Sequence, residues 1–85
     1  MIMPKLAIYP NPNSGHIEVL ADGFTEHVQM NIFDLAGKVM QSQMLDFSIG
    51  PRAFVSLSNI SNGIYFVRIN SNSGKIASVK MIIHR

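Results

Sequence analysis

The sequence predicts an all-β fold, a seven-stranded antiparallel β-sandwich with immunoglobulin-like connections. Short apolar segments, several with alternating apolar and polar residues, are separated by turn signals at spacings of roughly 8–12 residues. No stretch shows a helical period of useful length. The chain has no Cys and no Trp, so the Cys, Trp, Cys pattern of antibody domains is missing. We therefore expect the sandwich architecture without the antibody signature.

The first two expected strands flank a proline-rich turn. Leu6–Tyr9 is a short apolar run, and His16–Leu20 alternates, with Ile17 and Val19 on one side. Proline removes a backbone donor, while Asn and Gly favour turns. The segment between the two strands is therefore expected to be a rigid turn or a strand switch, with its structural residues at Pro10, Asn11, Pro12 and Gly15.

A β-hairpin is expected next. His27–Phe33 has the clearest alternation in the chain, which is typical of a half-buried antiparallel strand. Asp34 and Gly37 bound a tight loop, because Asp can accept backbone hydrogen bonds and Gly can adopt the left-handed conformation. The return strand, Lys38–Met44, is more polar and therefore nearer an edge. Ala53–Ser56 is predicted as a short fifth strand.

The most informative stretch of the chain runs from Leu57 to Asn70. Its polar loop ends in Asn62 and Gly63, a dipeptide that suits a tight turn because both residues tolerate positive φ. The apolar run that follows is predicted as the central strand of a sheet. Arg68 indicates which side faces water, so the core face is expected to be Tyr65, Val67 and Ile69, and the outer apolar side Ile64 and Phe66.

The last expected strand is Lys75–His84. Its alternation predicts a core-facing set and an outer set. The expected core residues are Ala77, Val79, Met81 and Ile83, and the expected outer residues are Ser78 and Lys80. A Lys on an edge strand also protects that edge against self-pairing.

Composition excludes several classes of protein. The 85 residues suit one domain, and apolar residues make up 47% against 14% charged, which is not the balance of a disordered chain. The net charge of +2 is spread along the sequence, whereas a nucleic-acid-binding protein usually shows a basic patch. No apolar run approaches the roughly 20 residues that span a bilayer.

The sequence contains no recognisable catalytic or cofactor motif, so we expect neither an enzyme nor a cofactor. His16, His27 and His84 lie on three different expected strands, without the spacing of metal ligands. Most acidic residues lie in or beside turns, where Asp commonly accepts backbone hydrogen bonds. A calcium site formed by Asp22 and Glu26 is the one metal-binding alternative.

The aromatic residues leave a second function open. Aromatic side chains on strands usually fill a sandwich core, but exposed ones can stack on sugars. The alternative function is therefore an accessory β-sandwich module of a secreted enzyme that binds carbohydrate or protein. For carbohydrate binding, the sequence offers Phe33, Phe24 and Tyr9.

Four separate blocks of the sequence resemble the C-terminal sorting domain of type IX secretion (Por system) cargo. They extend from about Leu6 to Arg85, and their order and spacing make the resemblance specific. The blocks are Tyr9-Pro10-Asn11-Pro12 followed by Gly15, Val28–Asp34 with Gly37-Lys38-Val39, Leu57-Ser58-Asn59-Ile60 with the run from Gly63 to Ile69, and a last strand bearing Lys80.

This resemblance implies a domain that acts as an address. Residues 6–85 would direct a larger cargo protein through the type IX outer-membrane translocon, and residues 1–5 would be an added start or the end of a linker. A surface sortase would then remove the domain while attaching the cargo to anionic lipopolysaccharide. The implied location is the cell surface or exterior of a Gram-negative bacterium, reached through the periplasm. An upstream cargo domain is expected, and an edge-strand dimer is a further expected partner state.

The last strand is the expected contact with the secretion machinery. Recognition would use a surface and a strand edge, since the sequence indicates no pocket. The expected recognition residues are Lys75, Lys80, Met81, Ile82, Ile83, His84 and Arg85.

Overall fold

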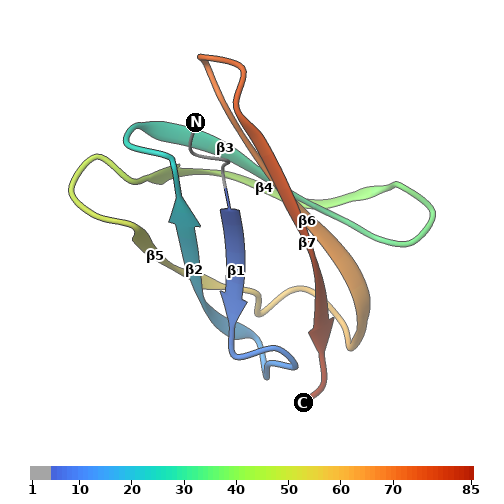
Figure 1. Cartoon of the computed structure of the whole chain (residues 1–85). Helices are drawn as coiled ribbons and strands as arrows, with labels where there is room; N and C mark the ends of the chain where they lie inside the picture. Colours follow the sequence, from blue (N-terminus) through green and yellow to red (C-terminus); the bar gives the residue numbers. More distant parts are fainter. Residues whose placement is uncertain (1–4) are drawn as a thin grey trace.

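Seven antiparallel strands form the two sheets of the domain. The computed structural model describes residues 5–85 (Figure 1). One sheet has the order β1-β2-β5, with bounds Lys5–Tyr9, His16–Asp22 and Arg52–Ser56. The other has the order β4-β3-β6-β7, with bounds Val39–Asp46, His27–Phe33, Gly63–Ser71 and Ile76–Ile83. These residues form no helix, so none of them belongs to a helix that could cross a membrane. The predicted all-β sandwich is confirmed.

The connections between strands cross repeatedly from one sheet to the other. The chain crosses after β2, after β4 and after β5, as in immunoglobulin-like sandwiches. The strand β6 pairs with β3 on one side and β7 on the other, so its predicted central place is confirmed. The polar strand β4 lies at an edge, as expected.

Strand boundaries differ from the predicted ones by a few residues. The first strand already begins at Lys5, which the sequence assigned to an added start or linker. Met1 to Pro4, the rest of that assignment, lie outside the described residues. The strand β4 continues two residues beyond its predicted end, to Asp46. It does so because it pairs with β3 over the full length of that strand, and Asp46 is opposite His27, the first residue of β3.

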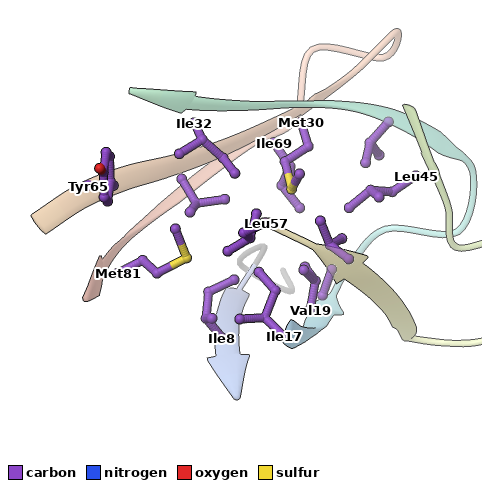
Figure 2. Packing of buried hydrophobic residues seen from close by; sticks show 14 of the residues in the cluster. Ile8, Ile17, Val19, Met30, Ile32, Leu45, Leu57, Tyr65, Ile69 and Met81 are labelled. Carbon is purple, nitrogen blue, oxygen red and sulfur yellow. The ribbon is translucent and has the colours of Figure 1, made fainter. Parts of the chain in front are cut away.

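The core lies between the two sheets and is built from the inward residues of each strand. Figure 2 shows side chains from both sheets meeting there, with Leu57 of the β5–β6 loop among them. On β6, Tyr65, Val67 and Ile69 are buried, while Ile64 and Phe66 are 43% and 44% exposed, which confirms the predicted faces. Alternation therefore sorted this strand correctly, because its side chains point to opposite faces in turn.

The aromatic residues divide between core and surface. Phe24, Phe47 and Tyr65 are buried, as expected of aromatics in a sandwich. Tyr9 and Phe54 are exposed instead, because alternation along their strands places them on the outer face opposite Ile8 and Val55.

Two loops show how local sequence sets the chain direction. In the β3–β4 hairpin, Asp34 Oδ1 accepts hydrogen bonds from the backbone N–H groups of Ala36 and Lys38, each at 2.9 Å. Gly37 has a φ of 87°, the left-handed conformation that glycine adopts without strain. In the β5–β6 loop, Gly63 has the expected positive φ, 158°, which residues with a side chain rarely adopt, and it is the first residue of β6. The turn there lies earlier, where the Ile60 N–H donates to the Leu57 carbonyl at 3.2 Å.

Replacing the buried Ile32 with Ala is expected to reduce the free energy of unfolding by about 2–5 kcal/mol, because it removes apolar contacts and leaves a cavity. Ile32→Val should lose only about 0.5–1.5 kcal/mol. The matched control is Ile49→Ala, since Ile49 is 94% exposed and should change stability by no more than about 0.5 kcal/mol. Urea denaturation measures all three, and equal losses for Ile32→Ala and Ile49→Ala would contradict the assigned core.

Candidate functional site

The predicted recognition residues lie on or directly beside β7, an edge strand of the four-stranded sheet. The side chains of Met81 and Ile83 are buried in the core between the sheets. They are not available to a partner that contacts the folded domain. Alternation on β7 thus separates residues that the sequence analysis grouped as one contact.

Three of the predicted residues remain on the outer side of β7. Lys80 and His84 are exposed, and Ile82 between them is partly buried. Lys75 lies apart, in the β6–β7 hairpin, where its Nζ donates to the Gly23 carbonyl at 2.8 Å. The structure therefore brings together Lys80, Ile82 and His84, and separates Lys75 from them.

The free edge of β7 is covered by the proline-rich turn of residues 10–15. The Asn11 side chain donates to the Lys80 carbonyl and accepts from the Ile82 N–H, each at 2.9 Å. Asn13 continues this pairing along β7: its N–H donates to the Ile82 carbonyl at 2.9 Å and its carbonyl accepts from the His84 N–H at 2.8 Å. A second chain adding to this part of the edge would have to displace these bonds.

Asn13 is the centre of the turn and was missed by the sequence analysis, which named Pro10, Asn11, Pro12 and Gly15. It is buried, and its Oδ1 accepts from the Gly15 N–H at 2.9 Å. This bond to the residue two positions ahead is an Asx turn, for which Asn before Ser-Gly is a recognised signal. The contact with Ile83, 70 positions away, carries no local signal.

Arg85 ties β7 to the loop between β5 and β6. Its Nη2 and Nη1 donate to the carbonyls of Leu57 and Ile60, both at 2.7 Å, and its backbone N–H donates to Asn62 Oδ1 at 3.1 Å. The guanidinium lies over Gly15, where an added Cβ would come within 2.7 Å of Nη2. Arg85, which the sequence analysis placed in the contact with the machinery, is exposed and also makes these hydrogen bonds within the domain. Figure 1 shows the C-terminus at the same end of the sandwich as the proline-rich turn.

The titratable side chains of the described residues form no metal-binding group. No three or more His, Asp or Glu side chains within residues 5–85 come close enough to share an ion. His27 lies 3.6 Å from Asp46, away from the other histidines. The pKa of Asp46 lies below its ordinary value because Ser48 donates hydrogen bonds to its carboxylate. Of the two proposed calcium ligands, Glu26 instead accepts from the Ser73 hydroxyl at 3.0 Å.

The three aromatic residues suggested for carbohydrate binding do not form one strip. Phe24 is buried, which corrects that suggestion for this residue. Tyr9 and Phe33 belong to different sheets. A shallow hollow does lie beside Tyr9 and Phe54, and Glu18 lies between them in register. The Glu18 carboxylate there is paired with Arg52 Nε at 3.3 Å.

The chain matches a known protein family. A family model described as a secretion system C-terminal sorting domain matches residues 7–84. No curated protein matches the chain. The matched span runs from within β1 to the residue after β7, so it includes the proline-rich turn, the β5–β6 loop and the outer residues of β7.

Replacing Arg85 with Ala is expected to lower the free energy of unfolding by about 1–3 kcal/mol, because two carbonyls lose charge-assisted hydrogen bonds. Arg85→Lys should recover only part of this loss, since an ammonium lacks the planar fork that reaches both carbonyls. Lys80→Ala is the control, because Lys80 is exposed and its side chain makes no hydrogen bond among the described residues. If urea denaturation gives Arg85→Ala and Lys80→Ala the same free energy of unfolding, Arg85 does not stabilise the domain in this way.

Proposed function

Because the chain belongs to the family of secretion system C-terminal sorting domains, we propose that it directs a larger cargo protein through the type IX outer-membrane translocon. Membership indicates a type IX C-terminal sorting signal, which implies export to the cell surface or beyond. A sorting-signal domain is not itself catalytic, and its partners are the type IX system and an upstream cargo. The observation that carries the proposal is a family match over residues 7–84, which is nearly the whole folded unit.

The proposed route has three stages. The cargo enters the periplasm of a Gram-negative bacterium with the domain at its C-terminal side. The domain is read by the translocon as a folded sandwich, and a surface sortase then cuts on the N-terminal side of β1 during attachment. The closed packing of residues 5–85 supports reading in the folded state, because the last strand shares its core with the other sheet.

We assign two roles to the residues predicted on β7. Lys80, Ile82 and His84 would contact the machinery, since their side chains lie on the outer side of the strand. Met81, Ile83 and Arg85 would act indirectly, by holding β7 in the sandwich through core packing and hydrogen bonds. Deleting residues 81–85 therefore tests folding and contact together, whereas single outer substitutions test contact alone.

The function is tested with a reporter that carries an N-terminal signal peptide and the 85-residue chain at its C-terminus, expressed in a bacterium with a type IX system. The reporter is expected at the cell surface or in the medium, without the domain attached. The same reporter without the chain, or in a strain that lacks the translocon, should stay in the periplasm. A reporter that is retained in the periplasm despite carrying the folded chain would overturn the proposal.

Lys80→Glu in the same reporter is expected to reduce the exported fraction several-fold, because it reverses the charge at the outer side of β7. The stability of the domain should change by no more than about 0.5 kcal/mol, since Lys80 is exposed. Lys5→Glu is the matched control, with the same charge change on the exposed start of β1 in the other sheet. If Lys80→Glu and Lys5→Glu are exported equally well, Lys80 does not contact the secretion machinery.

A further inference from the structure

The outer face of the four-stranded sheet carries a group of neighbouring apolar side chains. Cross-strand register places Phe66 directly between Phe33 on β3 and Lys80 on β7, and Phe33 is itself opposite Val39 on β4. Ile64 on β6 and Ile82 on β7 are opposite each other two positions further along these strands, and their side chains lie on the same outer face. We call these residues the outer apolar patch: Phe33, Val39, Ile64, Phe66 and Ile82.

Three of these five apolar side chains are exposed, and the other two are partly accessible. Val39 is 49% exposed and Phe66 and Ile64 are close to that value, while Phe33 and Ile82 are partly buried. Single exposed apolar residues are ordinary, but a contiguous group is typical of an interaction site. The patch has residues on all four strands of the sheet and adjoins the outer side of β7.

Two cations, Arg68 and Lys80, border the outer apolar patch on β6 and β7. The Arg68 guanidinium lies 5.0 Å from the centre of the Phe33 ring, and Lys80 lies beside Phe66. The nearest acid along the chain, Asp34, turns its Oδ1 toward its own hairpin. The other acids lie away from the patch: Asp46 is at the far end of the face with His27, Glu18 and Asp22 are on the other sheet, and Glu26 accepts from Ser73.

We propose that the outer apolar patch docks against a protein surface that is apolar at its centre and carries carboxylates at its border, on a component of the secretion machinery. This inference rests on the proposed sorting function and extends it from β7 to the whole outer face. Phe66 would be the central buried anchor, because aromatic side chains at the middle of an interface commonly contribute most of the binding energy. Arg68 and Lys80 would pair with the partner's carboxylates and set the orientation of docking.

A protein with this chemistry fits the patch better than the other two candidate occupants. A second copy related by two-fold symmetry would bring identical patches together, so the cations of both copies would gather at one interface. An anionic membrane is usually recognised by clusters of 4–8 cations, whereas three Lys or Arg residues border this patch in residues 5–85: Arg68, Lys80 and Lys38, which precedes Val39. A partner surface that is apolar at its centre and carries carboxylates at its border would complement both the apolar side chains and the cations of this patch.

The test uses the reporter fusion with Phe66→Ser and with the double variant Phe66→Ser/Ile64→Ser. Each is expected to lower the exported fraction roughly tenfold or more, as truncation of a central anchor does in other interfaces. The matched control is Phe54→Ser, since Phe54 is 76% exposed on the opposite sheet and should leave export unchanged. Arg68→Glu should also reduce export. Thermal melts of the isolated chain should show all these variants folded.

The results of this experiment distinguish failure of the proposed docking surface from failure of the proposed sorting function. If the parent fusion is exported and Phe66→Ser/Ile64→Ser is exported equally while remaining folded, the docking surface is refuted and the sorting function stands. If the parent fusion is retained, the function itself fails. Light scattering that shows a dimer dissolved by Phe66→Ser would identify a second copy as the occupant instead. Sedimentation with phosphatidylglycerol vesicles that depends on Phe66 would identify a membrane, and either result overturns the proposed protein partner.

Discussion

The pairing of Asn13 with the end of β7 is the contact on which the shape of this domain depends. It joins the turn after the first strand to the last strand, and so holds the open side of the two sheets together. Backbone groups at a sheet edge need partners when they are removed from water, and Asn11 and Asn13 provide them from both side chain and backbone. Arg85 then closes the adjacent loop over Gly15.

This arrangement makes the fold depend on contacts between distant parts of the chain. The Asn13 side chain and the Ile82 carbonyl are 69 positions apart, and the Arg85 bonds return across the β5–β6 loop. Folds dominated by such non-local pairing close late and slowly, because loop-closure entropy must be overcome first. A sandwich whose last strand has not arrived lacks Met81 and Ile83 in its core, so a surface that includes β7 exists only once the whole domain has assembled. A machinery that reads the outer face would thereby select folded domains.

The sequence predicted the parts of this structure that local pattern determines. Alternation gave the strands and their faces, including the buried side of β6 and the exposed positions of Ile64 and Phe66. It could not give the role of Asn13 or the inward bonds of Arg85, because those depend on segments brought together by the fold. The prediction that the side chains of Met81 and Ile83 lie on a contact surface was wrong for a similar reason. A family resemblance identified the last strand as a whole, but it did not distinguish the buried face of the strand from its exposed face. Gly63 shows that a dipeptide suited to a turn can also begin an extended strand.

The parallel sense of the bridge between Asn13 and Ile83 has a mechanical consequence. The start of β1 and the end of β7 lie at opposite ends of the sandwich (Figure 1), so under the proposed function a cargo before β1 would pull on one end and a partner bound at β7 on the other. Tension applied this way slides the two paired segments past each other, so their hydrogen bonds are loaded together in shear instead of opening one after another. We expect the domain to resist pulling on its two ends better than peeling, which force spectroscopy with handles at the two ends would show as one abrupt rupture. A small domain without cysteines could thus remain folded while a force acts between its two ends.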